Sequence, residues 1–270
     1  MDFDFALVLV VLTFVCGLVW LYDRVALAPT RQQRIKDAQA QSQGELPEAA
    51  LVELNREPGW VDTGKSMFPV LLIVLVLRSF LVEPFQIPSG SMLPTLKIGD
   101  FILVNKFHYG LRLPVLNTKI VAMNDPQRGD VAVFKYPKQP AVNYIKRVVG
   151  LPGDVIRYQN KTLYVNGVAQ SQQLLAQLPP NRPERLLMLE NLDGVQHQIF
   201  KDVMRPSQNM EWTVPEGHYF FVGDNRDNSN DSRYWGFVSD ELLVGKAFAV
   251  WMHWQTFFSV PSFSDVRVIE

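Results

Sequence analysis

Residues 131–149 read VAVFKYPKQPAVNYIKRVV, two apolar runs rich in β-branched and aromatic residues that are separated by a stretch with two prolines. Runs of this length bounded by turn residues are typical of β-strands. Similar runs stand at 101–107 (FILVNKF) and at 218–222 (HYFFV). Their number predicts a mostly β fold built around an antiparallel sheet.

Downstream of these runs, residues 155–168 (VIRYQNKTLYVNGV) predict a hairpin, because Asn166-Gly167 favours a turn with positive φ. The next segment, 169–210, is richer in Gln, Pro, Asn and charged residues. We interpret it as part of a β-ribbon insertion, or inserted subdomain, at about 155–213. This insertion carries no chemical signature in the sequence.

The composition of the whole chain excludes several classes of protein. The 270 residues include 47% hydrophobic residues, which is enough to build a core and too apolar for a disordered chain. Lys+Arg 26 nearly balance Asp+Glu 27, and no basic patch appears, so we expect no nucleic-acid partner. The single cysteine, Cys16, excludes an intrachain disulfide and a cysteine-based zinc cage. We expect no metal and no cofactor.

Residues 5–22, FALVLVVLTFVCGLVWLY, carry no charge. At the helical rise this stretch is long enough to cross about 30 Å of hydrocarbon. A cleaved secretory signal is the alternative, but it needs a basic start and a small-residue exit, whereas Asp2 and Asp4 precede this stretch and Trp20, Leu21 and Tyr22 end it. The sequence therefore predicts a transmembrane helix in 1–22, with a short external N-terminus.

A second apolar run, MFPVLLIVLVL at 67–77, continues past Arg78 to Val82. Because its uncharged part is short, a buried helix of a globular domain is the alternative interpretation. A membrane span over 66–82 would let the Arg78 side chain reach the interface and would place Pro69 in the first turn, where proline is tolerated.

The loop between the two spans predicts the topology. Four basic residues follow the first span closely, and none precedes it: Arg24, Arg31, Arg34 and Lys36. Positive residues favour the cytoplasmic side, so 23–65 is expected to be a cytoplasmic linker and 83–270 to lie outside. The linker, rich in Gln, Ala and charge, is expected to be solvated and partly helical, without chemistry of its own.

A Ser-Gly-Ser stretch, IPSGSMLPTLKIGD at 87–100, follows the second span. A simple turn is its plainest interpretation. The chain has no G-x-S-x-G elbow, and no serine is followed by lysine at the third position, so common serine-nucleophile signatures are missing. None of the four histidines sits in a motif: His108, His197, His218 and His253.

One lysine stands inside an apolar strand. In YIKRVV, alternation puts Tyr144, Lys146 and Val148 on one face. A lysine on an exposed strand face is the ordinary alternative. If the side chain is buried, its ammonium form is disfavoured and its pKa falls, which gives a neutral amine able to act as a general base.

The stretch GDNRDNSNDSRYWGFV, 223–238, is too polar for a core strand and too patterned for a linker. Its acidic spacing suggests a calcium loop. Counting from Asp224, however, puts Arg226 in a ligand position and Trp235 where the closing glutamate belongs, which argues against calcium.

Four blocks in order carry a family resemblance: EPFQIPSGSMLPTL at 83–96, RGDVAVFKYP at 128–137, NYIKRVVGLPGD at 143–154 and GDNRDNSNDSRYWGFV at 223–238. With the two N-terminal spans, the chain resembles bacterial type I signal peptidase (leader peptidase). The resemblance covers most of the chain and matches the linker and 169–210 only weakly. It favours a membrane span for the second apolar run.

The resemblance implies a membrane-bound serine endopeptidase that cleaves N-terminal signal peptides from exported preproteins after small residues, at A-x-A-like sites. Its partners would be these secretory preproteins and the lipid bilayer. Its place would be the bacterial cytoplasmic (inner) membrane, with the catalytic domain on the periplasmic side.

The same resemblance assigns roles to individual residues. It makes Ser91 the nucleophile and Lys146 its general base, a Ser-Lys dyad without histidine. Ser89 matches the side-chain donor to the oxyanion, and Ser229 matches the hydroxyl that orients the lysine amine. Two residues match a supporting ion pair: Asp231 and Arg233.

The resemblance also implies shallow apolar pockets for the substrate residues one and three positions before the cut. Core packing is the alternative for each of the wall residues. These residues are Phe85, Ile87, Pro88, Leu96, Tyr144 and Ile145.

Two other classes of protein share part of this pattern. A self-cleaving transcriptional repressor can use the same dyad, but a DNA-binding domain would replace the two spans. A noncatalytic membrane-anchored adaptor fits spans followed by a β domain equally well. It gives no reason for Lys146 to stand in an apolar strand.

Overall fold

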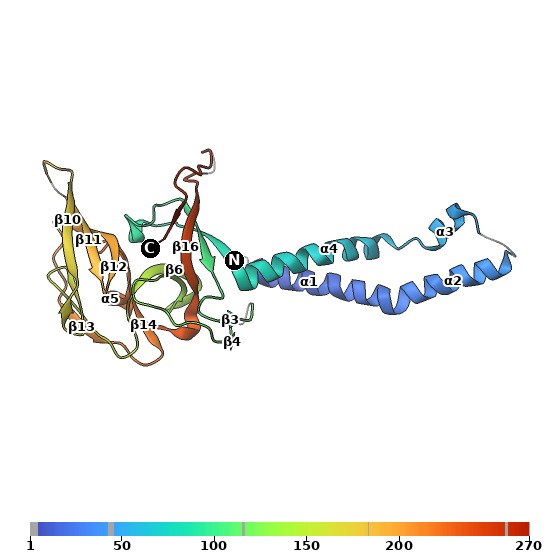
Figure 1. Ribbon diagram of the computed structural model, residues 1–270, viewed down its shortest axis with the longest axis horizontal. Coiled ribbons are helices and arrows are strands. Elements are labelled where there is room, and N and C mark those ends of the chain that lie inside the picture. The colour runs from blue at the N-terminus through green and yellow to red at the C-terminus, as the bar shows by residue number, and fades with distance from the viewer. Residues whose placement is uncertain (1–4, 43–45, 115–116, 183, 257–258, 270) are drawn as a thin grey trace. The chain divides into compact units, whose positions relative to one another are not determined.

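The computed structural model describes residues 5–42, 46–114, 117–182, 184–256 and 259–269. The chain divides into two units, Met1–Ser79 and Phe80–Glu270. The first is helical and the second consists mainly of antiparallel strands (Figure 1). The predicted fold class, two apolar helices followed by a mostly β domain, is confirmed. The predicted external N-terminus, residues 1–4, lies outside the described residues.

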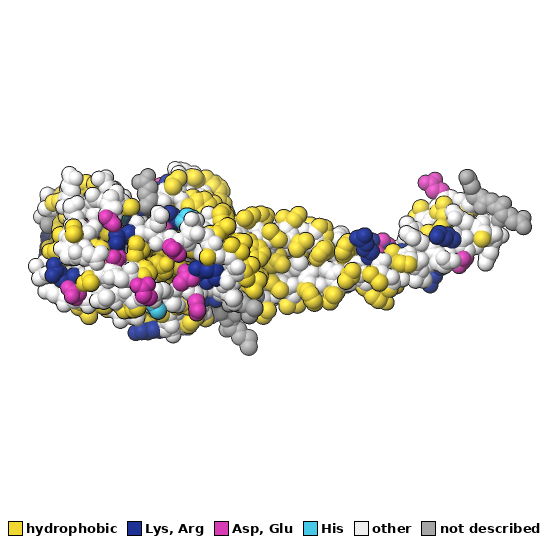
Figure 2. Space-filling view, turned by 60° about the horizontal axis from the view of Figure 1, so that its bottom comes forward, with side chains coloured by type: hydrophobic (Ala, Val, Ile, Leu, Met, Phe, Trp, Pro, Cys, Tyr) yellow, Lys and Arg dark blue, Asp and Glu magenta, His cyan; other side chains and the backbone are white. Residues whose placement is uncertain are grey.

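Two long helical segments make up most of the N-terminal unit. Their elements are α1 (Phe5–Tyr22), the π-helical turn η1 (Asp23–Leu27), α2 (Ala28–Gln41), α3 (Glu48–Leu54), α4 (Gly59–Val76) and the π-helical turn η2 (Leu77–Leu81). Ala6–Gln41 and Gly59–Leu81 are both long and apolar enough to cross a membrane. Figure 2 shows hydrophobic side chains over most of the visible surface of α1 and α4.

Helices α1 and α4 lie side by side, and glycine allows their backbones to approach (Figure 1). A Cβ on Gly64 would lie 2.6 Å from Val19 Cγ1, and one on Gly17 would lie 2.9 Å from the Phe68 ring. Small residues at helix contacts are typical of membrane helix pairs, because van der Waals packing replaces the hydrophobic driving force there.

The second helix differs from its prediction at its start. Helix α4 begins at Gly59, directly after the extended Pro58, and not near residue 66. Pro69 therefore lies inside the helix, so the expectation that it stands in the first turn was wrong. Proline has no N–H, so one backbone hydrogen bond of α4 is missing at this point. Within the linker predicted to be solvated and partly helical, α2 and α3 are the helical parts, and most of their residues are exposed or half-buried.

Four charged side chains join the end of the first span to the start of α4. Arg31 Nη1 lies 2.7 Å from Asp23 Oδ1, and Lys65 Nζ lies 3.2 Å from Asp23 Oδ2 and 2.6 Å from Glu57 Oε1. Arg31 also contacts Glu57 at 3.3 Å. Asp23 is buried, and its charge is tolerated there because two cations pair with it.

The C-terminal unit is organised by one large sheet, whose strand order is β1-β2-β16-β5-β6-β14-β15, with β17 added to β16. These strands are β1 (Val82–Gln86), β2 (Asp100–Asn105), β5 (Val131–Tyr136), β6 (Gln139–Gly150), β14 (His218–Val222), β15 (Val238–Ser239), β16 (Leu243–His253) and β17 (Arg267–Val268). The runs predicted at 131–136 and 218–222 coincide with β5 and β14.

Three smaller sheets accompany the large one, in the orders β10-β11-β12, β13-β7-β8-β9 and β3-β4. Their strands are β3 (Leu111–Arg112), β4 (Lys119–Val121), β7 (Val155–Gln159), β8 (Thr162–Val165), β9 (Val168–Ala169), β10 (Ser171–Leu178), β11 (Arg185–Leu192), β12 (Val195–Asp202) and β13 (Met210–Thr213). The short helical turns of this unit are η3 (Gly90–Met92), α5 (Ser232–Trp235) and η4 (Asp240–Leu242).

The hairpin predicted over 155–168 exists, but its turn stands elsewhere. Strands β7 and β8 are joined at Asn160-Lys161, both with positive φ (50° and 60°). Asn166-Gly167 closes the next turn, between β8 and β9. The run therefore folds into three short strands, because both pairs adopt the left-handed conformation that a tight turn requires.

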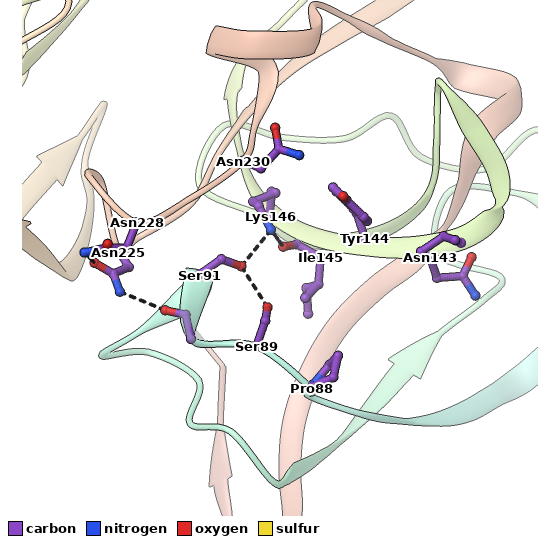
Figure 3. A pocket seen from close by; sticks show the side chains of 12 residues that line it. Pro88, Ser89, Ser91, Asn143, Tyr144, Ile145, Lys146, Asn225, Asn228 and Asn230 are labelled. Carbon is purple, nitrogen blue, oxygen red and sulfur yellow. Dashed lines mark hydrogen bonds between the residues drawn. The ribbon is translucent and has the colours of Figure 1, made fainter.

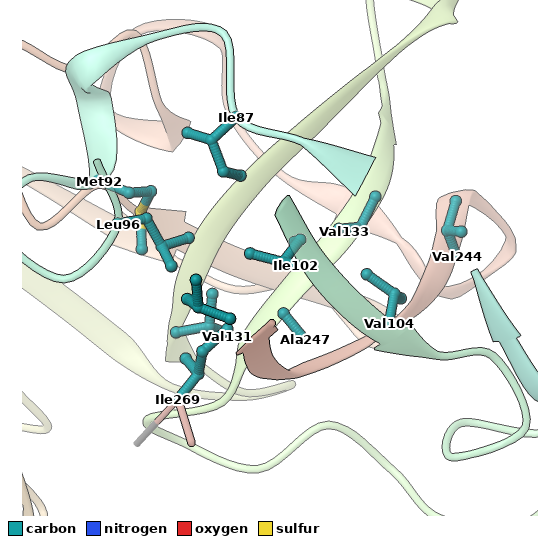
Figure 4. Packing of buried hydrophobic residues seen from close by; sticks show 11 residues of the cluster. Ile87, Met92, Leu96, Ile102, Val104, Val131, Val133, Val244, Ala247 and Ile269 are labelled. Atoms are coloured by element: carbon teal, nitrogen blue, oxygen red, sulfur yellow. The ribbon is translucent and has the colours of Figure 1, made fainter. Parts of the chain in front are cut away.

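A hydrophobic core fixes the chain on both sides of the Ser-Gly-Ser stretch (Figure 4). Ile87, Met92 and Leu96 are at most 2% exposed and pack with Ile102 of β2 and Val133 of β5. Fully burying a side chain of this size stabilises the fold by about 1.5–3 kcal/mol. The turn that carries Ser91 is thereby anchored at both ends to the large sheet.

Candidate active site

Ser91 and Lys146 meet although 55 positions separate them in the sequence. Ser91 stands in the turn η3, next to the buried Met92 that anchors this turn, and Lys146 projects from β6. Lys146 Nζ donates to Ser91 Oγ at 2.8 Å and to the Ile145 carbonyl oxygen at 2.7 Å (Figure 3). The pairings of β1, β2, β16, β5 and β6 within one sheet bring the two side chains together.

The Lys146 side chain is buried. The residue is 4% exposed, and its amine lies 5.3 Å from the centre of the Tyr144 ring. Burial disfavours the ammonium form and lowers the pKa of Lys146 to about 8, although the carboxylates of Asp231 and Asp224 act in the opposite direction. The alternative of an ordinary lysine on an exposed strand face does not describe this residue.

A cavity of about 530 Å³ opens at the two side chains. Figure 3 shows the side chains that surround it. The lining residues are Pro88, Ser89, Gly90, Ser91, Val142, Asn143, Tyr144, Ile145, Lys146, Asn225, Asn228 and Asn230.

The residues predicted to contact substrate fall into two groups. Pro88, Tyr144 and Ile145 line the cavity. The other three pack in or against the hydrophobic core that anchors the Ser91 turn: Phe85, Ile87 and Leu96. Ile87 is 2% exposed and Leu96 is 0% exposed, which agrees with the core-packing alternative for these two residues.

Ser89 stands at the exposed mouth of the cavity. Its Oγ lies 3.4 Å from Ser91 Oγ, and the two hydroxyls form a long hydrogen bond (Figure 3). The Ser89 backbone is extended and leads straight into η3. Its hydroxyl and the backbone N–H of Ser91 therefore belong to the same short segment of chain.

Ser229 is buried near the same turn but does not bond to the lysine. The Ser229 Oγ and the Ser91 carbonyl oxygen lie within 2.2 and 2.6 Å of the point where a Cβ on Gly223 would stand. Ser229 also contributes to lowering the pKa of the Asp231 carboxyl. Within the described part of the chain, the Ser229 hydroxyl has no hydrogen-bond partner of normal geometry.

Asp231 and Arg233 form a buried pair at the start of α5. Arg233 Nη2 and Nε each donate to the Asp231 carboxylate at 2.8 Å. Asp231 also accepts from the backbone N–H groups of Gly223, at 3.0 Å, and Arg233. Burial alone would raise the pKa of Asp231, but the guanidinium of Arg233 holds it below its usual range.

Several asparagines of the cavity were not predicted to line it. Asn143 directly precedes Tyr144 in one of the four sequence blocks, and Asn228 and Asn230 belong to the polar stretch 223–238. The sequence showed these motifs but not that the three side chains line one cavity.

Asn225 holds the turn that carries Ser91. Its backbone N–H donates to the Ser91 carbonyl at 3.1 Å, and its Nδ2 donates to the Gly90 carbonyl at 2.9 Å.

A second buried ion pair supports the lysine strand. Arg147, next to Lys146 on β6, donates from Nε and Nη2 to both oxygens of Asp224, at 3.0 and 2.9 Å. Both residues are at most 1% exposed. Burial acts against the Asp224 carboxylate, but Arg147 holds its pKa below the usual range.

No group of three or more His, Cys, Asp or Glu residues that could hold a metal ion occurs among the residues that the structure describes.

Comparison with known proteins identifies the family. The family model of signal peptidase, peptidase S26, matches residues 60–254. Signal peptidase I of Pseudomonas fluorescens and that of Pseudomonas aeruginosa are each 54% identical to this chain, and each match covers 100% of both proteins. A crystal structure of a signal peptidase I from Enterococcus faecalis V583 matches with 33% identity and a TM-score of 0.34, over 46% of this chain and 98% of that one.

The family model makes this chain a peptidase of the S26 type. Its N-terminal unit carries two candidate membrane helices. The chain belongs to the family of bacterial type I signal peptidases. The identification made from the four sequence blocks is confirmed.

Proposed function

We propose that this protein removes N-terminal signal peptides from exported preproteins as a serine endopeptidase with a Ser-Lys dyad. The observation that carries the proposal is the 2.8 Å contact between Ser91 Oγ and the amine of the buried Lys146. A general base must be within hydrogen-bond reach of the proton that it takes, and its pKa should lie near the working pH. Lys146 meets both conditions.

In the first half of the reaction, the neutral amine of Lys146 takes the proton from Ser91 Oγ as this oxygen attacks the scissile carbonyl carbon. The carbonyl oxygen becomes an oxyanion, which the Ser91 N–H and the Ser89 hydroxyl stabilise. The intermediate collapses and the C–N bond breaks. Lys146 donates its extra proton to the leaving amine, and the signal peptide remains bound to Ser91 as an ester.

In the second half, water replaces the amine. Lys146, neutral again, takes a proton from the water molecule as its oxygen attacks the ester carbonyl. The new oxyanion uses the same two donors, and the C–O bond to Ser91 breaks. The proton held by Lys146 returns to Ser91 Oγ, so the enzyme is regenerated. The signal peptide leaves as a carboxylic acid, which then gives its proton to the solvent and becomes a carboxylate.

Ser229 is assigned the role of orienting the amine. Its hydroxyl is buried close to Gly223, below the Ser91 carbonyl, and is not engaged by a bond of normal geometry among the described residues. In this role the Ser229 hydroxyl would pair with the neutral amine of Lys146 during the reaction. Asp231 and Arg233 hold the backbone on which Ser229 stands, since the Asp231 carboxylate binds the N–H of Gly223.

The substrate is proposed to bind in an extended conformation along the edge of the sheet. Strand β1 is an edge strand, and its chain leads to Pro88 and Ser89 at the cavity. An added strand gains main-chain hydrogen bonds, and the side-chain pockets give selectivity. The walls formed by Pro88, Tyr144 and Ile145, with Phe85, Ile87 and Leu96 in or against the core, are apolar and favour small residues at A-x-A-like sites.

The catalytic unit is proposed to face the periplasm, and 23–65 to lie in the cytoplasm. The basic residues of 23–65 that follow α1 closely support this orientation, because positive residues are retained on the cytoplasmic side. Protease added to spheroplasts should degrade the C-terminal unit and spare the 23–65 segment. Protection of the C-terminal unit together with degradation of 23–65 would contradict this orientation and indicate the opposite one.

The dyad is tested with the full-length protein in detergent and a preprotein that carries an A-x-A site. Ser91→Ala and Lys146→Ala should each abolish specific cleavage, and Ser89→Ala should lower kcat by about 10²- to 10³-fold. Exposed residues of the same types supply matched controls, Ser171→Ala and Lys138→Ala, which should cleave normally. Normal cleavage by either dyad variant would rule out this mechanism.

A further inference from the structure

The segment 224–226 is bonded on both of its sides. On one side, Phe200 N of β12 donates to the Asp224 carbonyl at 2.9 Å, and Arg226 N donates to the Phe200 carbonyl at 3.0 Å. On the other side, Asn225 N donates to the Ser91 carbonyl at 3.1 Å. A strand of the insertion is therefore connected to the turn of Ser91 through three residues of chain.

The side chain of Asn225 strengthens the connection to that turn. Its Nδ2 donates to the Gly90 carbonyl at 2.9 Å (Figure 3). Backbone and side chain of Asn225 together therefore fix two consecutive carbonyls, those of Gly90 and Ser91. Asn225 is 5% exposed, and its neighbour Arg226 is 1% exposed. A displacement of 224–226 would move the peptide groups that set the position of Ser91 Oγ.

A buried ion pair holds this segment against the insertion. Arg226 Nη1 donates to Glu190 Oε1 of β11 at 2.8 Å, and Arg226 Nη2 donates to Glu190 Oε2. Glu190 is 0% exposed. Both oxygens thus meet both terminal nitrogens of one guanidinium, a geometry that fixes direction as well as distance.

Other groups of the β10-β11-β12 sheet complete the surroundings of Glu190. Gln172 Nε2 donates to it at 2.7 Å, and His197 Nε2, its cross-strand neighbour, lies 3.3 Å away. The Glu190 carboxylate in turn raises the pKa of Lys201 through space, against the larger lowering effect of burial. Burial would raise the pKa of Glu190, but Arg226 and His197 hold it well below its usual range, so the pair with Arg226 is ionic at neutral pH.

We propose that Glu190, in the insertion, is a positioning residue for the peptidase reaction. It holds Arg226, and through the 224–226 segment and Asn225 it sets the backbone that carries Ser91. This inference rests on the proposed function. It gives the β10-β11-β12 sheet a part in catalysis although this sheet supplies none of the residues that line the cavity.

The first test is Glu190→Gln, which keeps the size of the side chain and leaves the buried Arg226 without its counter-charge. We expect kcat to fall by about 10- to 100-fold, because small misplacement of a reacting group costs rate on this scale. KM should stay within about twofold, since the walls of the cavity are unchanged. The matched control is Glu211→Gln, an exposed glutamate on β13 of the same insertion, with no expected change.

The second test is a double-mutant cycle with Asn225→Ala, which removes the bond to Gly90. If Glu190 acts through this segment, Glu190→Gln should lose much less activity in the Asn225→Ala background than in the wild type. Effects of residues that act independently add instead. Should Glu190→Gln prevent folding, the same cycle is run with Glu190→Asp, which keeps the charge but withdraws it by one methylene.

The proposal is overturned by a wild-type kcat in a folded Glu190 variant, or by an equal loss in both backgrounds. Ser91→Ala, assayed in the same preparation, separates this outcome from failure of the proposed function. Cleavage by Ser91→Ala would reject the dyad itself. An inactive Ser91→Ala with additive Glu190 and Asn225 effects would reject only the role of Glu190.

Discussion

Gly223 lies against Ser91 so closely that a Cβ on Gly223 would stand 2.6 Å from the Ser91 carbonyl oxygen. The same Cβ would meet the Ser229 hydroxyl at 2.2 Å. Real Cβ atoms do not approach other atoms to this extent. The polar stretch that begins at Gly223 therefore packs under the Ser91 turn only because this position has no side chain.

The first prediction follows from this contact. Gly223→Ala should push the Ser91 turn away from Lys146 and lower kcat/KM by about 100-fold or more, since misplacement by about 1 Å has effects of this size. Gly59→Ala is the control, because a Cβ at Gly59 meets nothing within 4 Å. Steady-state cleavage of a preprotein measures both. Normal cleavage by Gly223→Ala would mean that the Ser91 turn accommodates the added Cβ, which contradicts this prediction.

The second prediction concerns the pH dependence of the wild type. In the proposed mechanism Lys146 must be neutral to accept the proton, and burial lowers its pKa to about 8. We expect kcat/KM to rise tenfold per pH unit below about pH 8 and to level off above it, as one group of the free enzyme loses a proton. A profile that is flat from pH 6 to pH 9, with chemistry rate-limiting, would exclude lysine as the base.

The third prediction concerns Asp231, whose carboxylate raises the pKa of Lys146 through space. Asp231→Asn removes that negative charge and leaves the positive Arg233 in place. Loss of the carboxylate and the now unbalanced positive charge of Arg233 both disfavour the ammonium form of Lys146. Its pKa should therefore fall, and the acidic limb of the kcat/KM profile should move to lower pH. Maximal kcat should fall as well, because Gly223 N–H loses a charged acceptor. A limb that moves to higher pH would contradict the electrostatic assignment.

The fourth prediction concerns stability. Below about pH 8, Lys146 carries its charge in both the folded and the unfolded chain, so the cost of burying it is fully present. Between about pH 8 and 10.5 the unfolded chain keeps the proton that the folded chain has lost, and the free energy of unfolding should rise with pH. The gain over this window is about 3 kcal/mol, since a tenfold difference in proton affinity corresponds to about 1.4 kcal/mol.

Lys146→Met isolates this contribution from other titrating groups, Lys201 among them, whose pKa is also lowered to about 8 by burial. Denaturant unfolding of the detergent-solubilised chain, followed by tryptophan fluorescence, should show the variant to be more stable than the wild type at pH 7. Its advantage should shrink towards pH 10.5. A difference that does not change with pH would mean that Lys146 is hydrated in the folded protein.

Much of the fold could be predicted because its elements have a local signal. Apolar runs gave the strands at 131–136 and 218–222 and the helix at 5–22. The turn at Asn160-Lys161 had no such signal, since lysine seldom adopts positive φ. Lys161 is held there by distant groups, and its Nζ donates to Asp227 Oδ2 at 3.0 Å.

The candidate site was predictable to the extent that its residues stand in motifs. Ser91 and Lys146 lie in two quoted blocks, but only the pairing of strands brings them to 2.8 Å. Glu190 could not have been found, because 169–210 has no chemical signature and its partner Arg226 is 36 positions away. A buried ion pair between such segments is a property of the tertiary structure, which a single sequence does not display.

The four charges that join α1, α2 and α4 have a consequence for how the helix pair sits in lipid. The 18 residues of α1 before Asp23 rise about 27 Å at 1.5 Å per residue, close to the thickness of a hydrocarbon layer. Deeper insertion of the helix pair would transfer two carboxylates and two cations from the interface into the hydrocarbon region. The four charged side chains therefore limit how deeply the pair of helices α1 and α4 can insert into the hydrocarbon layer.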